Sequence, residues 1–358
     1  MTTTTAPIDR WSRGVLAHVV RCPVCDAADR ALHASAVFDH LHPDGPDRWQ
    51  VWRCARCASL YLDPRPDDAS IGRAYDAYYT HSTHTPANGD GRELGLAWSL
   101  VHGYMNRRFD ARVEPAFRIG YPILAAVEPL RLKLDYHGRH LFRALTKHLG
   151  ERSVLDVGCG NGEFVVRARQ LGWRGVGVDP DPAAVAACRH QGVEAHVGNV
   201  EDLPASFDGM FDMVTLRHSI EHGPAPRAQI RACHRRLRDG GVLWMAWPNP
   251  QGLGSRLFRS SWRGLEVPRH LCIPSIGAAI SMLTDAGFID VRVERRGHHA
   301  RSITRESARI ARLRPGWANR LRGIVGAWIG PVADVLATIG GRFGEELVVT
   351  ARRGMARA

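Results

Sequence analysis

Residues 154–162 have the composition of a loop that holds a nucleotide. They read VLDVGCGNG, so an apolar run passes directly into glycines at alternate positions, Gly158, Gly160 and Gly162. Glycine allows a positive φ and lets a ligand lie against bare main chain. The third glycine position of a dinucleotide-binding loop is Glu163 here, and a carboxylate there would repel a pyrophosphate. The loop therefore predicts an adenosine ligand without phosphates.

Asp179 is the candidate partner of the ribose. It closes a second apolar stretch, roughly 20 residues after the loop, where nucleotide-binding folds place a carboxylate that accepts hydrogen bonds from ribose hydroxyls. Asp179 also precedes Pro180, so it can cap the next helix. The two roles are compatible.

A cluster of His218, Glu221 and His222 follows a later apolar stretch, 211–216. Histidine is the natural base near neutral pH, and proton removal is needed when a group is transferred to an acidic oxygen or carbon. His218 can border the nucleotide site, while Glu221 and His222 line the acceptor side or bind a cation. The alternative is that Glu221 caps or bridges locally and His222 packs at the end of the strand.

His270 is our preferred general base. It lies in the loop 262–271, which reads WRGLEVPRHL and begins at Trp262. The alternative is a structural loop in which Arg269 pairs with an acid.

Two Cys-x-x-Cys pairs predict a zinc site. Four thiolates complete a tetrahedral Zn²⁺ shell and leave no open position, so the zinc would be structural. A redox dithiol and disulfides are the alternatives. The four ligands are Cys22, Cys25, Cys54 and Cys57.

The elements that must position these residues alternate between strand and helix from residue 151 onward. This alternation predicts an α/β fold with a parallel sheet. The expected strands are 153–157, 174–178, 193–197, 211–216, 242–247, 289–293 and 346–351. The expected helices are 162–171, 183–190, 228–237 and 275–286.

Three regions follow from these patterns. Residues 1–66 form the N-terminal zinc module, 67–150 a helical linker or substrate cap, and 151–358 the nucleotide-binding domain. Within the last region, 302–341 predicts a helical insertion with apolar residues at helical spacing. The insertion packs on the domain, or its apolar side touches a membrane or a lipidic substrate.

The composition is that of an ordinary globular protein, with 44% hydrophobic and 23% charged residues. The net charge of +12 allows binding to nucleic acid, although a basic surface is unspecific. The first ten residues lack the apolar core of a signal peptide, and no apolar run of about 20 residues is free of charge. We expect a cytoplasmic protein. The sequence does not predict its oligomeric state.

The loop, its strand and Asp179 resemble those of the class I S-adenosylmethionine-dependent methyltransferases, over about residues 151–353. The resemblance implies a doubly wound, seven-stranded Rossmann-like sheet with S-adenosylmethionine as the cofactor. Residues 217–222 resemble the family's His-x-x-Glu-His segment, which also implies a place for Arg217 beside the cofactor. The cofactor residues implied in this way are Asp156, Gly158, Gly160, Gly162, Asp179, Asn199, Val200 and Arg217.

A zinc ribbon in front of such a domain, followed by a Tyr-rich segment, resembles bacterial natural-product and sugar methyltransferases. In those enzymes the ribbon and the Tyr-rich segment approach the active site, and a loop like 262–271 covers the substrate. The acceptor contacts implied here are Tyr75, Tyr78, Tyr79, Trp262 and Arg269.

The sequence therefore predicts methylation of a small molecule at carbon or oxygen, in secondary-metabolite or sugar biosynthesis. The first alternative is an RNA methyltransferase whose zinc ribbon and arginines bind the nucleic acid. The second is a cofactor-binding partner protein without catalytic activity.

Overall fold

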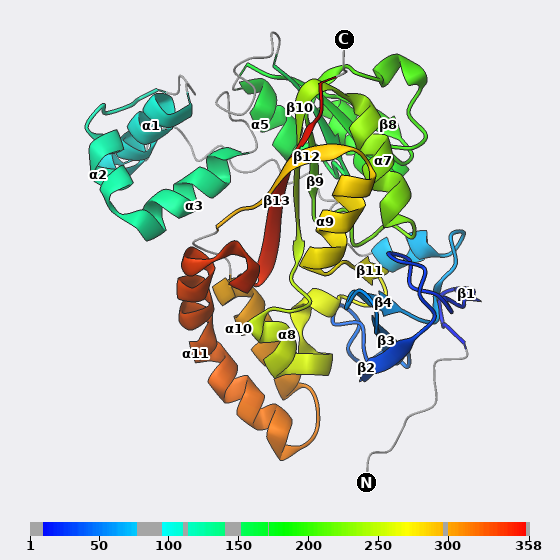
Figure 1. The fold of residues 1–358 in the computed structure, drawn as a ribbon. Coiled ribbons are helices and arrows are strands. Elements are labelled where there is room, and N and C mark those ends of the chain that lie inside the picture. The colour runs from blue at the N-terminus through cyan, green and yellow to red at the C-terminus, as the bar shows by residue number, and fades with distance from the viewer. Residues whose placement is uncertain are drawn as a thin grey trace.

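The computed structural model describes residues 10–76, 95–109, 114–139, 152–170, 172–295 and 300–355. A large central sheet carries helices on both faces, and a small β module lies at one end of it (Figure 1).

The central sheet has seven strands in the order β12-β13-β10-β9-β6-β7-β8. Only β13 runs antiparallel to its neighbours, and the other printed pairings are parallel. This confirms the predicted fold class. The strands are β6 (Ser153–Val157), β7 (Arg174–Asp179), β8 (Glu194–Val197), β9 (Phe211–Arg217), β10 (Leu237–Pro248), β12 (Phe288–Val293) and β13 (Glu346–Arg353).

Both faces of the sheet are buried because successive side chains of each strand enter different cores. Val154 and Met213 pack with helices α5 (Glu163–Gln170) and α6 (Pro182–His190), whereas Leu155 and Val214 belong to the core on the other face. Helices α7 (Pro226–Arg236) and α9 (Ile276–Asp285) cover that second face. Burial on both sides explains why these strands are continuous apolar runs.

After β6, the chain adds β7 and then β8 on one side of β6. It then crosses over and adds β9 and then β10 on the opposite side of β6. In open α/β sheets the carboxyl ends of the strands at such a switch point form a ligand-binding crevice. The glycine loop after β6 and the histidine cluster after β9 therefore lie at the same edge.

The N-terminal module contains β1 (Leu16–Ala17), β2 (Arg30–Val37), β3 (Trp49–Cys54), β4 (Leu60–Leu62), β5 (Arg65–Pro66) and the short helix η1 (Ile71–Tyr75). It extends past the expected end at residue 66, because the Ser70 hydroxyl accepts a hydrogen bond from Val15 N at 3.0 Å. Its sheet is completed by β11 (Cys272–Ile273), which pairs with β4. The module is thus joined to the loop that carries His270.

Within 67–150, the structure describes η1 and three helices, α1 (Leu96–Phe109), α2 (Gly120–Ala126) and α3 (Glu128–Arg139). These three helices share a small core in which the buried Tyr104 hydroxyl donates to Asp135 at 2.5 Å. In Figure 1 they lie at the left, while the N-terminal module lies at the lower right. Their role as a substrate cap stays a prediction.

The predicted insertion is a hairpin of α10 (Ala300–Arg312) and α11 (Trp317–Ile339) between β12 and β13. It packs near α8 (Leu253–Phe258), which follows β10, and Arg263 N donates to Ser307 of α10 at 2.9 Å. The remaining short helices are η3 (Ala205–Phe207), η4 (Arg259–Ser261), η5 (Arg263–Leu265) and η6 (Gly341–Phe343).

Among the described helices, none is by itself long and apolar enough to cross a membrane. The two arms of α11, Trp317–Gly326 and Trp328–Ile339, meet at 57° and reach that length and composition only when taken together. Pro331 accounts for the bend, because a proline ring clashes with the carbonyl four residues earlier.

Candidate functional site

The glycine loop has the backbone that its sequence predicts. Gly158, Gly160 and Gly162 have φ values of 76°, 54° and 83°, in the region that favours glycine. The loop is also packed closely, since a Cβ on Gly158 would lie 2.8 Å from the Ser219 hydroxyl and one on Gly162 would lie 2.5 Å from Cys188 Sγ. Its course is therefore fixed before any ligand binds.

Asp156 lies at the end of β6, buried beneath this loop. Thr215 on the neighbouring β9 donates its hydroxyl proton to Asp156 Oδ1 at 2.6 Å. Burial raises the pKa of Asp156 to about 6, opposed by Arg217 and by the Thr215 hydrogen bond. A carboxylate held in this state gains from any cationic group that approaches it, such as the amino group of an amino-acid moiety.

Asp179 ends β7 beside the loop. Its Oδ2 accepts from Gly160 N at 2.8 Å and its Oδ1 from Asp181 N at 2.9 Å. Burial raises the pKa of Asp179, while these two backbone hydrogen bonds act to lower it. Each carboxylate oxygen can accept a further hydrogen bond, so a diol can be held here. The following helix is capped by Asp181 instead, which accepts from Ala183 N at 2.8 Å.

The other expected cofactor residues occupy different environments. Asn199 is exposed and its Nδ2 donates to Asp202 at 3.3 Å, so the side chain can be redirected to a ligand. The Val200 side chain is fully buried in the core, which leaves only its backbone for a contact with adenine. Arg217 is exposed at the end of β9, and its guanidinium lies 4.9 Å from the centre of the Phe164 ring.

His218 is held between two buried carboxylates. Its Nε2 lies 2.6 Å from Glu346 Oε1 and its Nδ1 lies 3.2 Å from Glu221 Oε1. The backbone of His218 is left-handed, with φ 51°, a conformation that is uncommon for residues other than glycine. Burial acts to raise the pKa of Glu221, but the hydrogen bond with His218 and the nearby histidines hold it below the usual value.

His222 is partly exposed, although less so than His218. Its Nδ1 lies 2.8 Å from the Tyr75 hydroxyl and 3.1 Å from the Arg269 carbonyl oxygen, and its ring meets the His270 ring edge to face at 4.7 Å. A carbonyl oxygen can only accept, so we assign the proton of neutral His222 to Nδ1. Nε2 then carries the lone pair that can accept a proton.

His270 is buried, in contrast to our expectation of a base that meets the acceptor. Its Nδ1 donates to the Gly264 carbonyl at 2.8 Å, and its Nε2 faces Glu266 Oε2 at 3.5 Å and Glu221 Oε1 at 3.9 Å. Burial lowers the pKa of His270 to about 4, so the ring is neutral at pH 7. It is placed to orient His222.

Arg269 and Trp262 are buried and so face no acceptor in this structure. The Arg269 guanidinium, 0% exposed, bonds Asp39 at 2.7 and 3.1 Å and lies 3.4 Å from Glu266. Trp262, 2% exposed, packs across Gly264. Both side chains hold loop 262–271 in place, and Arg269 ties it to the N-terminal module, so their expected contact with an acceptor stays a prediction.

Tyr75 does reach the site, through its hydrogen bond with His222. Burial raises the pKa of the Tyr75 hydroxyl well above its usual range, so it stays protonated. Tyr78 and Tyr79 lie outside the described residues.

Several groups that orient the site were not predicted from the sequence. Thr215, Glu266 and Glu346 each hold an expected site residue, and Asp39 pairs with Arg269 from the N-terminal module. Glu346 gave a signal, because this acidic residue directly precedes the buried apolar run Leu347–Val349. No spacing rule links Asp39 to residue 269.

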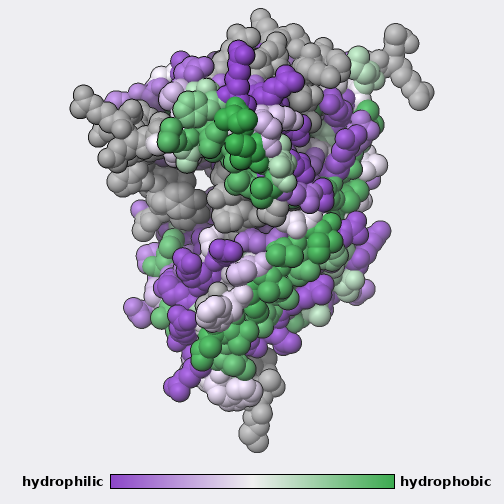
Figure 2. All heavy atoms as spheres, turned by 90° about the vertical axis from the view of Figure 1, so that its left-hand side faces the viewer, coloured by the Kyte–Doolittle hydropathy of each residue, from purple (hydrophilic) through white to green (hydrophobic). Residues whose placement is uncertain are grey.

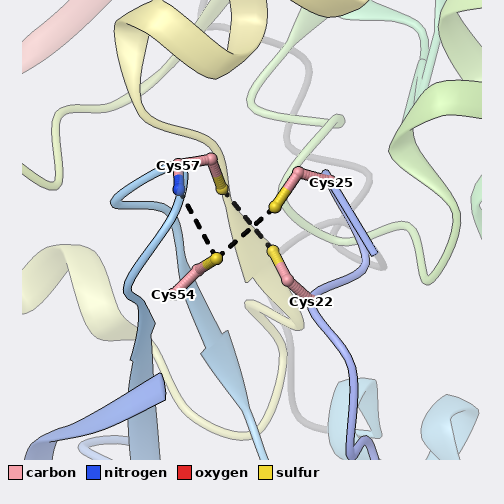
Figure 3. A group of neighbouring side chains, drawn as sticks. All are labelled: Cys22, Cys25, Cys54 and Cys57. Atoms are coloured by element: carbon pink, nitrogen blue, oxygen red, sulfur yellow. Dashed lines mark hydrogen bonds between the residues drawn. The ribbon is translucent and has the colours of Figure 1, made fainter. Parts of the chain in front are cut away.

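Among the described residues, two clusters of side chains could hold a metal ion. The four cysteine sulfurs of the N-terminal module lie within 4.8 Å of one another, with Cys22–Cys57 at 3.6 Å and Cys25–Cys54 at 3.4 Å (Figure 3). Zinc–sulfur bonds of about 2.3 Å in a tetrahedron put sulfurs about 3.8 Å apart, so the cluster fits Zn²⁺. The second cluster is Glu221, His222 and His270, whose ligand atoms also lie within 4.8 Å of one another.

Residues 132–293 match the family model described as a methyltransferase domain. This segment holds the glycine loop, Asp179, the histidine cluster and His270. The chain therefore contains a methyltransferase domain, as the sequence predicted.

Curated relatives match within a narrower part of the chain. A protein named ubiquinone biosynthesis O-methyltransferase from Xanthomonas oryzae pv. oryzae (strain PXO99A) is 39% identical over 132 residues, 35% of this chain and 52% of the relative. A protein of the same name from Pseudomonas paraeruginosa (strain DSM 24068 / PA7) is 35% identical over 107 residues, 28% of this chain and 46% of the relative. The chain spans about half the length of these relatives.

Solved structures are similar at lower identity. A SAM-dependent methyltransferase from Archaeoglobus fulgidus is 20% identical with a TM-score of 0.43, covering 66% of this chain and 99% of that one.

Proposed function

We propose that this protein transfers a methyl group from S-adenosylmethionine to a small-molecule acceptor. The observation that carries the proposal is one sheet edge, at which the loop after β6 and Asp179 lie near the partly exposed His222 after β9. The glycine loop and Asp179 suit a nucleoside, whereas His222 suits an acceptor with an acidic hydroxyl or carbon.

The residues of the first part fit the cofactor by their chemistry. Asp179 would hold the ribose diol, Asp156 and the three glycines the methionine part, and Asn199 the adenine. The loop carries Glu163 at the start of α5, which disfavours a phosphate-bearing ligand. S-adenosylmethionine, when bound, supplies an electrophilic methyl group, so the protein has to align the acceptor and remove its proton.

His222 takes that proton in our proposal. Its Nε2 is the nitrogen left without a proton, Tyr75 and the Arg269 carbonyl hold its Nδ1, and His270 buttresses the ring. The name of the matching relatives favours a hydroxyl oxygen as the acceptor atom over carbon.

We propose further that the four cysteines bind a structural zinc ion. The module that they close reaches the site through β11, through Asp39–Arg269 and through Tyr75. Zinc would thus hold the acceptor side in shape without touching the reacting atoms.

Titration calorimetry with S-adenosylhomocysteine tests the cofactor site. Asp179→Ala should weaken binding about 10- to 100-fold, since hydrogen bonds to a charged group are lost. Asp181→Ala, two residues away at the helix cap, should bind nearly as the wild type does. Equal affinity in all three proteins would overturn the site.

Labelled S-adenosylmethionine with a panel of phenols, sugars and polyketide-like hydroxy acids tests the acceptor class. We expect label on a small molecule at a hydroxyl oxygen, located by mass spectrometry. Label that enters total RNA instead would replace this proposal by the nucleic-acid alternative.

Metal analysis tests the zinc site. We expect about one zinc per chain, lost in Cys54→Ser and kept in Cys233→Ser, whose sulfur lies in the main core. Zinc-free protein with normal stability would contradict the proposal.

A further inference from the structure

Helix α11 buries its small residues and exposes its large apolar ones. Gly326 faces α8 so closely that an added Cβ would lie 2.2 Å from the Phe258 ring, and Gly330 would meet Arg301 of α10 at 2.8 Å. The outward positions are bulky. They are Trp317, Leu321, Ile324, Val325, Trp328, Val332, Val335 and Ile339. We call these eight residues the α11 stripe.

The α11 stripe is a continuous surface. Its members recur at intervals of three and four residues along both arms of the helix, and Figure 2 shows the aliphatic residues of this helix as a green band running obliquely across one face. Trp317 and Trp328 are 79% and 78% exposed. Soluble monomers seldom expose contiguous apolar patches of this kind without a binding role.

A second apolar area lies on the same face. Figure 2 shows it above the α11 stripe, over the α1–α3 helices. The exposed large apolar residues of these helices and their flanks include Trp98, Ile119, Ile123 and Val127. Two separate apolar areas on one side of the molecule suit a broad surface better than a single groove.

The surroundings of the α11 stripe are basic. Residues 300–343 contain eight arginines but only Glu306 and Asp334 as acids, and Asp334 is buried, accepting from Ala300 N. Arg314, in the turn before α11, also lines a cavity of about 350 Å³ with Arg259 and His33, and no acidic residue lines it.

We infer that the α11 stripe docks this protein on the surface of a lipid bilayer that contains anionic lipids. Tryptophan prefers the boundary between headgroups and acyl chains, and arginines beside an apolar face add attraction to anionic headgroups. A second copy of this chain is the poorer occupant, since a symmetric contact would bring the same arginines together. The hairpin also contacts loop 262–271 through Arg263 and Ser307, so docking would bring the acceptor side near the membrane.

Vesicle cosedimentation with the full chain tests this inference, which does not depend on methyl transfer. The protein should bind vesicles of phosphatidylcholine with about 30% phosphatidylglycerol more tightly than pure phosphatidylcholine, and added salt should weaken binding. The double variant Ile324→Ser, Trp328→Ser should lower the partition coefficient at least about tenfold. Both residues are exposed, so the variant should keep the wild-type circular dichroism and affinity for S-adenosylhomocysteine.

The matched control is Ile289→Ser, an exposed isoleucine on β12 whose loss should leave vesicle binding unchanged. The inference would be overturned if the double variant bound vesicles as tightly as the wild type. It would also be overturned if the wild type bound neither kind of vesicle. A wild-type dimer that the double variant dissociates would assign the α11 stripe to a second copy instead.

Discussion

The two sides of the candidate site are built in different ways. The cofactor side comes mainly from one stretch of chain, 156–202, with Thr215 and Arg217 of the adjacent strand β9 beside Asp156. The acceptor side draws on parts that are far apart in sequence, from Asp39 and Tyr75 to His222, His270 and Glu346. The first is local and rigid, whereas the second depends on how the N-terminal module docks. Each variant below should therefore affect one side and spare the other.

The largest effect should come from His222→Ala. Loss of a positioned base lowers kcat by about 10²- to 10⁴-fold, while affinity for S-adenosylhomocysteine should stay within about twofold. Turnover and calorimetry on the same preparation measure both. His190→Ala, an exposed histidine at the end of α6, is the control. A normal kcat for His222→Ala would show that another residue is the general base.

Arg269→Met should destabilise the protein by about 3 to 5 kcal/mol, because it leaves the Asp39 carboxylate buried without its main partner. Chemical denaturation measures the loss. Turnover should fall with stability, and cofactor affinity should be retained by the fraction that stays folded. The control is Arg21→Met, which breaks an exposed ion pair with Asp26. It should change neither the stability nor the turnover. Loss of cofactor affinity in folded Arg269→Met would show that the two sides are not separate.

Asp156→Asn should make the ligand-free protein more stable at high pH. Burial raises the pKa of Asp156 from 3.8 to about 6, so ionisation costs folding free energy as the pH rises through this window. The variant should gain up to about 3 kcal/mol at pH 8 and little at pH 4, while binding S-adenosylhomocysteine more weakly. Denaturation curves across this pH range check it. A gain that is largest at pH 4 would contradict the burial argument.

The smallest effect should be the difference in stability between alanine variants of two glycines that have nearly the same φ. Gly162 and Gly172 have φ 83° and 82°, but only at Gly162 would an added Cβ meet a neighbour, Cys188 Sγ. Gly172→Ala should cost about 1 to 2 kcal/mol from backbone strain alone, and Gly162→Ala about 1 kcal/mol more. Only Gly162→Ala should weaken S-adenosylhomocysteine binding. An equal loss of stability in the two variants would mean that the glycine loop can shift to accommodate the added methyl group.

The sequence by itself determined the central sheet and the cofactor side. Apolar strands, alternating glycines and Asp179 follow one another along the chain, so their spacing already specifies how they meet. The four cysteines were found for the same reason, since each pair is a short local motif.

Only the tertiary structure decided the acceptor side and the outer surface. Burial of His270 and Arg269 depends on β11 joining the sheet of the N-terminal module, a contact between residues more than two hundred positions apart. The pairing of Glu346 with His218 likewise depends on β13 lying beside β10. The helical periodicity of α11 predicted an apolar side but not its direction. That direction was set by the close approach of its glycines to α8 and α10, which turns the large residues outward.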